Sequence, residues 1–359
     1  MLGRLYLVVT PRPGWSLEAT LDRTERALAG GVEVVQLRAK DWEARPTLAL
    51  GERMLALARR YGVPFFLNDR PDLAALLGAD GVHLGQNDLT PEEARRFFAG
   101  MVGRSTHAPE QALRALEEGV DYLSIASPNH LHYPQIRMAL RLGANALSEK
   151  PLVLWPEEIA RLKELEARTG RRVYTVLQLR VHPSLLALKE RLGQEKGAKD
   201  VVLTYVTGRG KWHGKSWKVD DAKSGGLATN IGIHFFDLLA WLFGRALHVE
   251  VHARTPTVNA GYLELEGARV RWFLSIDPSF VPEPLRRQGK RTYRSIAVDG
   301  EEVEFSEGFT DLHTEVYRKT LAGEGFGLDE AAEAIRVAAL LRTLPLSQPS
   351  PENRHPFLG

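Results

Sequence analysis

The chain has 359 residues, which predicts about two domains at roughly 150 residues each, and its 44% hydrophobic content is enough for a packed core in both. It carries 47 Lys and Arg residues against 45 Asp and Glu, and a net charge of +2 argues against a whole-protein field for nucleic acid or membranes. It has no cysteine, which excludes disulfide scaffolds, zinc-thiolate sites and thiol nucleophiles.

The N-terminal apolar run is too short for the core of a signal peptide, and no small-residue cleavage site follows it. The longest unbroken apolar run, near residues 238–243, is far shorter than the roughly 20 residues that cross a bilayer. We therefore expect a cytoplasmic protein with a small-molecule partner and neither a nucleic-acid nor a membrane partner.

The first 180 residues repeat one unit, in which a β-branched apolar run is followed by a polar junction, an amphipathic helix and a glycine. The repeat predicts eight strands: LYLVVT (5–10), VEVVQLR (32–38), VPFFLND (63–69), GVHLG (81–85), MVGRSTH (101–107), DYLSIAS (121–127), ANALSEK (144–150) and RVYTVLQLR (172–180).

Short apolar strands that alternate with helices are typical of a parallel sheet covered by helices, so the predicted fold class is α/β. Eight such units are also the number in a closed barrel. We expect residues 1–180 to form parallel βα units, either as a composite eight-stranded barrel or as an open doubly wound sheet.

The pattern changes after about residue 180. From residue 201 onward, longer strands are separated by turns, with one long helix near residues 226–243 and two closing helices near 311–321 and 328–344. This indicates an α+β domain with a mainly antiparallel sheet over residues 181–359. One face of such a sheet would expose apolar side chains unless another subunit covered it, so we expect a homo-oligomer.

Polar side chains cluster where the strands of the first half end, at the edge where parallel α/β folds place their active sites. Carboxylates and an amide suit Mg²⁺ beside a phosphorylated ligand, and basic side chains suit the phosphate. The alternative is that the two carboxylates only shape turns or cap helices. The cluster comprises Gln36, Arg38, Lys40, Asn68, Asp69, Asp88, Ser105 and His107.

Four strings from this half resemble thiamin-phosphate synthase, a (β/α)8 barrel, over residues 4–124. They are QLRAK (36–40), FLNDR (66–70), GADGVHLGQND (78–88) and RSTHAPEQALRALEEGVDYLS (104–124). The resemblance implies that Asp69 and Asp88 are Mg²⁺ ligands. It also implies that a hydroxymethylpyrimidine pyrophosphate contacts Gln36, Lys40, Asn68 and Ser105.

From about residue 119 onward the chain resembles the Gfo/Idh/MocA oxidoreductases instead. The matching strings are SPNHLH (127–132), EKPL (149–152) and SGGLATNIGIHFFD (224–237). QLRVHP (178–183) and RGKWHGKSWK (209–218) resemble most the UDP-N-acetylglucosaminuronate 3-dehydrogenases, which act on a nucleotide sugar with NAD.

Such enzymes need a base that takes the proton of a sugar hydroxyl while hydride leaves the same carbon for nicotinamide. The resemblance assigns this chemistry to Lys150 and His234, with Asn230 at a position where many members carry Asp. It assigns Gln178 and Arg180 to the substrate. The residues implied for the cofactor are Pro128, Asn129, His132 and Glu149.

Each resemblance covers an incomplete enzyme. The pyrophosphate and thiazole-phosphate loops of the synthases are replaced after residue 124, and no G-x-G-x-x-G turn occurs anywhere in the chain to hold a dinucleotide. We interpret the chain as a fusion with its seam at residues 118–124, in which ANALSEK and RVYTVLQLR serve as barrel strands seven and eight.

Three functional hypotheses follow. The first is a nucleotide-sugar 3-dehydrogenase substrate domain whose activity is weak or absent because the glycine-rich turn that binds NAD is missing. The second is Mg²⁺-dependent binding of a pyrimidine pyrophosphate, or residual synthase activity, in the N-terminal half. The third is a structural chimera without activity.

Overall fold

The computed structural model describes residues 6–12, 14–209, 213–303 and 312–358. Residue contacts divide the chain into two compact units. Unit 1 comprises Met1–Leu123, Met138–Asn145 and Thr310–Gly325, and unit 2 comprises Ser124–Arg137, Ala146–Phe309 and Phe326–Gly359.

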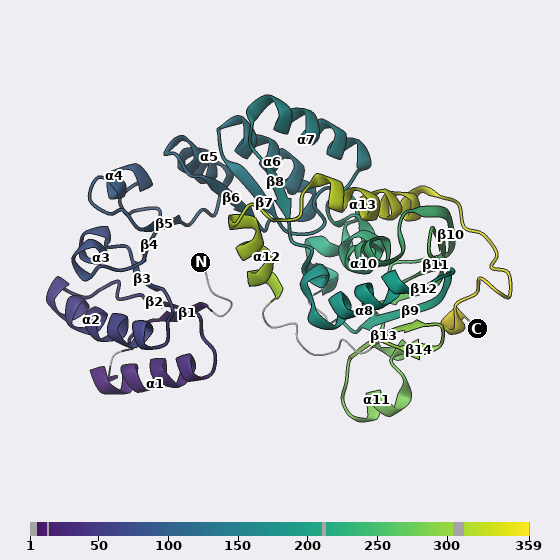
Figure 1. Cartoon of the computed structure of the whole chain (residues 1–359), viewed down its shortest axis with the longest axis horizontal. Coiled ribbons are helices and arrows are strands. Elements are labelled where there is room, and N and C mark those ends of the chain that lie inside the picture. The colour runs from purple at the N-terminus through teal and green to yellow at the C-terminus, as the bar shows by residue number, and fades with distance from the viewer. Residues whose placement is uncertain (1–5, 13, 210–212, 304–311, 359) are drawn as a thin grey trace. The chain divides into compact units, whose positions relative to one another are not determined.

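Unit 1 contains a five-stranded parallel sheet with the strand order β1-β2-β3-β4-β5. Figure 1 shows helices α1 to α4 along one side of this sheet. The strands are β1 (Tyr6–Val9), β2 (Val34–Leu37), β3 (Phe65–Asn68), β4 (Gly81–Leu84) and β5 (Met101–Arg104). The helices are α1 (Leu17–Ala29), α2 (Ala44–Arg60), α3 (Pro71–Leu77), α4 (Pro91–Arg95), α5 (Pro109–Glu117) and α12 (Leu312–Leu321).

The two faces of this sheet differ because side chains alternate along each strand. Val35, Leu37 and Leu67 belong to the apolar core that packs under the helices. Gln36 and Asn68 occupy the alternate positions, so they point to the other face and are nevertheless buried. Polar groups therefore lie beneath the carboxyl ends of β2 and β3, where the sequence predicted a site.

Gly81 is required by close packing on that other face. A Cβ at this position would lie 2.1 Å from Cε1 of Phe66, whose ring is buried and contacts the Tyr6 ring. We expect Gly81→Ala to destabilise unit 1 by about 1–3 kcal/mol, as overpacking does in well-packed cores. Urea unfolding measures the change.

The same substitution at Gly193 is the matched control. Gly193 lies in helix α8 (Pro183–Gln194), and a Cβ there meets nothing within 4 Å. Gly193→Ala should leave stability unchanged or raise it by up to about 1 kcal/mol, because glycine disfavours helix. Equal losses for both variants would contradict the packing explanation.

The other three parallel strands form a separate sheet with the order β6-β7-β8. They are β6 (Tyr122–Ile125), β7 (Asn145–Ser148) and β8 (Val173–Thr175), connected by α6 (His132–Arg141) and α7 (Pro156–Thr169). Among the described residues, β5 pairs only with β4 and β1 only with β2.

The predicted α/β class with parallel βα units is confirmed, but the composite barrel is wrong. The single doubly wound sheet is also wrong, because the eight strands divide into two sheets. The number of βα units agrees with the prediction, but that number determines neither which strands pair nor whether a sheet closes. ANALSEK and RVYTVLQLR accordingly form β7 and β8 of an open sheet rather than barrel strands.

The mixed sheet of unit 2 has the order β10-β11-β12-β9-β13-β14. All its pairs are antiparallel except β9 with β12, which confirms the mainly antiparallel prediction. The strands are β9 (Lys199–Thr207), β10 (Ala246–Arg254), β11 (Val258–Leu265), β12 (Ala268–Ser275), β13 (Thr292–Val298) and β14 (Glu301–Glu302).

Helices α9 (Asp221–Ser224), α10 (Ile233–Phe243), α11 (Glu283–Arg287) and α13 (Leu328–Thr343) complete unit 2. Among the described residues, one helical stretch, Asp221–Phe243, has the length and composition of a membrane span. Its apolar window is 61% buried inside the fold, which is typical of a core helix.

Candidate functional site

A cavity of about 150 Å³ in unit 2 brings together all three residues predicted for catalysis, Lys150, Asn230 and His234, with the predicted substrate residue Gln178. Loops and strands distant in sequence contribute to it. The remaining lining residues are Leu179, Tyr205, Arg209, Ile231, Phe235 and Arg294.

Lys150 follows β7, and its Nζ donates a hydrogen bond of 3.0 Å to the backbone carbonyl of Asn230. Burial lowers the pKa of Lys150 to about 8. The nearby Glu149 carboxylate opposes this shift in pKa, while the cations Lys218 and Arg209 add to it. A lysine with this pKa is neutral in a useful fraction of molecules near pH 8, so it can act as a base.

Asn230 reaches the cavity from a π-helical turn, Ala228–Gly232, and His234 reaches it from the first turn of α10, which follows directly. Such turns frequently mark functional sites. Gly232 allows this turn to pack closely on β12, since a Cβ there would lie 2.7 Å from Cδ1 of Leu274. The sequence NIGIH therefore places an amide and an imidazole on one wall of the cavity.

The sequence analysis missed three polar residues of this cavity, Tyr205, Arg209 and Arg294. Tyr205 in β9 pairs with Arg294 in β13, and the guanidinium lies 5.5 Å from the centre of the tyrosine ring. The Nε of Arg209 is buried without a hydrogen-bond partner in the part of the chain that the structure describes. Two arginines and a lysine give the cavity the chemistry of an anion site.

A second polar cluster occupies unit 1. Tyr6 Oη donates to Gln36 Oε1 at 2.7 Å, and Gln36 Nε2 donates to Asn68 Oδ1 at 2.5 Å. Burial raises the pKa of Tyr6 to about 12, so its hydroxyl remains a donor at neutral pH. These two hydrogen bonds fix the side-chain amides of Gln36 and Asn68, both predicted to contact the substrate.

Asp69 and Asp88 lie beside each other above Gly85. A Cβ on Gly85 would lie 2.9 Å from Asp88 Oδ2 and 3.9 Å from Asp69 Oδ1. Burial and the Asp88 carboxyl raise the pKa of Asp69, while Asn68 and Lys40 oppose that rise. Lys40 Nζ is 3.7 Å from Asp69 Oδ2. Two carboxylates with a nearby ammonium are a donor set that suits Mg²⁺ and a phosphate.

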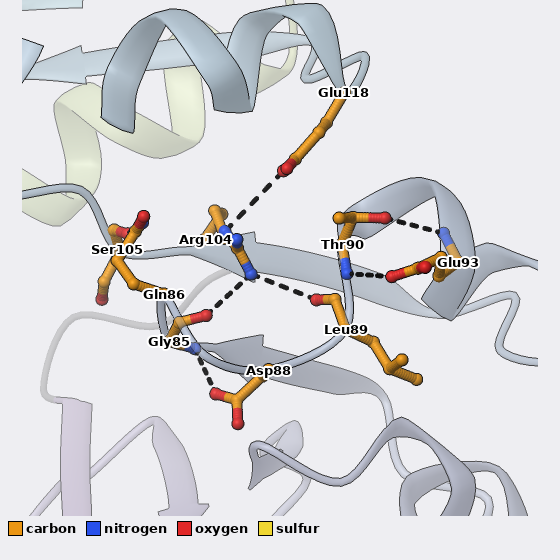
Figure 2. Close-up of polar contacts among 9 residues, drawn as sticks. All are labelled: Gly85, Gln86, Asp88, Leu89, Thr90, Glu93, Arg104, Ser105 and Glu118. Carbon is orange, nitrogen blue, oxygen red and sulfur yellow. Dashed lines mark hydrogen bonds and ion pairs between the residues drawn. The ribbon is translucent and has the colours of Figure 1, made fainter. Parts of the chain in front are cut away.

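Ser105 follows β5 and lies beside Gln86 of the loop that carries Asp88 (Figure 2). Its hydroxyl lies 2.7 Å from Nε2 of His83, and its carbonyl accepts a hydrogen bond from the Gln86 amide. Arg38 follows β2 and is fixed through its backbone N–H, which donates to Val9 O at 2.8 Å. No group of three or more His, Asp or Glu side chains suited to a metal occurs among the described residues.

Comparison with known proteins separates the chain into two parts. A family model described as thiamine monophosphate synthase matches residues 5–129. A second, described as oxidoreductase family, C-terminal alpha/beta domain, matches residues 199–281. The thiamine-phosphate synthase of Thermus thermophilus is 71% identical over 202 residues, covering 54% of this chain and 98% of that protein. The Deinococcus radiodurans synthase is 53% identical over 148 residues, covering 40% and 53%.

The chain is also similar to a solved structure. The WlbA (WbpB) dehydrogenase from Thermus thermophilus, in complex with NAD and alpha-ketoglutarate, is 81% identical with a TM-score of 0.70, covering 82% of this chain and 99% of that one. Its complex with NAD and UDP-GlcNAcA is 80% identical, with a TM-score of 0.69 and the same coverage. The chain belongs to two families. It is a fusion of a thiamine-phosphate synthase part with a Gfo/Idh/MocA dehydrogenase part.

Two of the predicted cofactor residues, Asn129 and His132, contact backbone carbonyl oxygens of neighbouring segments. Asn129 Nδ2 donates to Ser224 O at 2.7 Å. Both imidazole nitrogens of His132 contact carbonyl oxygens, Nδ1 with Pro151 at 2.7 Å and Nε2 with Ser127 at 2.8 Å.

Pro128 precedes a 3-10 turn (Asn129–Leu131) that leads into α6, and Glu149 follows β7. Both therefore lie at the carboxyl ends of β6 and β7, the edge where open parallel sheets bind nucleotides. A contact of these residues with NAD stays a prediction. The glycine-rich turn that would hold its pyrophosphate is absent from the sequence.

The side chain of Arg180 donates hydrogen bonds to other residues of unit 2. Its guanidinium donates to both Asp237 oxygens, at 2.7 and 3.1 Å, and to Glu330 O at 2.8 Å. Burial raises the pKa of Asp237, and Arg180 opposes that rise. A substrate contact by Arg180 stays a prediction, as does one by the loop that includes residues 210–212, which lie outside the described residues.

Proposed function

We propose that the dehydrogenase part of the fusion binds a UDP-linked N-acetylglucosaminuronate and oxidises its 3-hydroxyl with NAD. The observation that supports this proposal best is the single cavity containing Lys150, His234, Arg209 and Arg294. The WlbA relative binds NAD and UDP-GlcNAcA, and it shares 80% identity with this chain.

Neutral Lys150 takes the proton of the sugar hydroxyl in this proposal, and NAD supplies the hydride acceptor when it is bound. His234 hydrogen-bonds and orients the sugar from the facing helix. Arg209 and Arg294 bind the anionic part of the substrate, because a partly desolvated guanidinium pairs strongly with carboxylate or phosphate oxygens.

The sequence predicted weak or absent activity from the missing glycine-rich turn, and the comparisons do not support that loss. NADH binding tests it directly. Fluorescence titration with NADH, alone and with UDP-GlcNAcA, should show saturation within roughly 1 µM to 1 mM, the usual range for enzyme ligands. No saturation up to millimolar NADH with the sugar present would overturn the proposal. Asp69→Asn, a change in unit 1, is the control that should leave NADH binding unchanged.

A second function is favoured by the Asp69 and Asp88 pair. We propose that the synthase part binds Mg²⁺ and a pyrimidine pyrophosphate, with the two carboxylates as metal ligands. Gln36 and Asn68 contact the pyrimidine, and Lys40 contacts the pyrophosphate. The support is that two carboxylates, which repel each other without a cation, are held together above Gly85.

Asp69→Asn tests the metal site with little disturbance, since Asp69 has a φ of 66° and asparagine tolerates that conformation. Isothermal titration of the wild-type fusion with Mg²⁺ should show heat that the variant lacks. Magnesium at about 100 times its Kd should also stabilise wild type by about 2.7 kcal/mol. Identical titrations for both proteins would rule this site out.

A further inference from the structure

The loop that carries Asp88 is held at both ends by one side chain, Arg104. Arg104 is the last residue of β5, and its Nη1 donates to Gly85 O at 2.7 Å and to Leu89 O at 3.1 Å. Figure 2 shows these two bonds diverging from the same guanidinium. Its side chain is only 5% exposed, so the bonds form largely out of water.

The loop itself determines where Asp88 points. Asp88 Oδ2 accepts a hydrogen bond of 2.6 Å from Gly85 N, so the carboxylate is fixed to the loop that Arg104 clamps. Thr90 and Glu93 form a reciprocal cap that begins α4 directly after the loop. Moving the carbonyls of Gly85 or Leu89 would therefore move Asp88 relative to Asp69.

Glu118 holds Arg104 from the opposite side. It is the residue after α5, its side chain is 11% exposed, and Oε2 lies 3.8 Å from Arg104 Nε. Neither carboxylate oxygen of Glu118 has a hydrogen-bond partner within the described structure. A buried carboxylate and a buried guanidinium thus compensate each other, and the ion pair fixes where the guanidinium lies.

We propose that Arg104 is a positioning residue for the Asp69–Asp88 metal site, with Glu118 holding Arg104 in place. The inference rests on the proposed Mg²⁺ function of the synthase part. Groups that orient metal ligands from outside the coordination sphere commonly change metal affinity by 10–100-fold when removed.

The sign of the effect separates positioning from simple electrostatics. Arg104 is a cation near a cation site, so loss of its charge alone would strengthen metal binding. Loss of positioning would weaken binding instead. Arg104→Ala should therefore bind metal about 10–100-fold more weakly if the proposal is correct.

Mn²⁺ is a suitable probe, because it prefers the same oxygen ligands and its free aqua ion is measured by electron paramagnetic resonance. The full-length fusion is titrated as wild type and as Arg104→Ala, Arg104→Lys and Arg26→Ala. Arg104→Lys keeps the charge but lacks the Nε that faces Glu118 and the planar geometry that directs Nη1 to the two carbonyls, so it should bind weakly too. Exposed Arg26, which pairs with Asp22, is the matched control. Guanidinium ion added at a non-denaturing concentration should restore part of the affinity of Arg104→Ala.

Hydrogen exchange of residues 85–89 without metal gives a second readout. Arg104→Ala should exchange these amides at least about tenfold faster, while Arg26→Ala leaves them unchanged. Unchanged or tighter Mn²⁺ binding by Arg104→Ala, or unchanged exchange, would overturn the proposal. Absence of Mn²⁺ binding by wild type would instead overturn the metal function, and exchange would still decide whether Arg104 holds the loop.

Discussion

Arg180→Met is expected to destabilise unit 2 by about 3–5 kcal/mol, the usual cost of leaving one member of a buried ion pair alone. The reason is that Asp237, only 2% exposed, would keep its carboxylate without the two hydrogen bonds that Arg180 donates. The Glu330 carbonyl would lose its donor as well. Urea unfolding followed by tryptophan fluorescence measures the loss, since Trp272 is fully buried in this unit.

The pH dependence of this loss identifies its cause. Burial already raises the pKa of Asp237, and without Arg180 nothing opposes that rise. In the variant, the buried Asp237 side chain is tolerated better as a neutral carboxylic acid than as a carboxylate. The loss of unfolding free energy relative to wild type should therefore be smallest below about pH 4 and should grow as pH rises. Arg180→Met with Asp237→Leu should recover most of the stability, because apolar replacement of a buried pair is often neutral. A double variant as unstable as the single one would contradict this interpretation.

The local structure of the chain could be predicted because short patterns determine it. Ser16 accepts a hydrogen bond from Ala19 N and so caps α1. Thr90 likewise caps α4 together with Glu93. The glycine that follows a helix in the repeated unit has a left-handed φ at six positions, Gly31, Gly62, Gly78, Gly119, Gly143 and Gly170. Such features depend only on neighbours within a few residues.

Strand pairing could not be predicted in the same way, because it depends on partners far along the chain. The barrel prediction failed for this reason. The residues of the unit 2 cavity could likewise be predicted only where they lie in local sequence motifs. Lys150 and His234 lie in strings that carry a family resemblance, and both reach the cavity. Arg294 lies in no motif and enters the site only because its strand pairs with that of Tyr205, 89 positions earlier in the chain.

Lys150→Met is expected to lower the turnover number of the proposed dehydrogenase by about 100–10,000-fold, the typical contribution of a general base. The sugar should still bind, because Arg209 and Arg294 remain in the cavity. Turnover is followed by NADH absorbance with UDP-GlcNAcA as substrate. Lys163→Met is the matched control, since that lysine is half exposed and pairs with Asp329. It should leave turnover unchanged.

The pH profile separates a base from a lysine that only shapes the cavity. Burial lowers the pKa of Lys150 to about 8, so the neutral base accumulates as pH rises, and the wild-type rate should climb to a plateau above about pH 8. Lys150→Met should lose this rise together with the turnover. A titration of the reductively ¹³C-methylated protein by NMR should show a lysine with the same depressed pKa. A Lys150 pKa near 10, or a variant that keeps the rise near pH 8, would mean that another group accepts the proton.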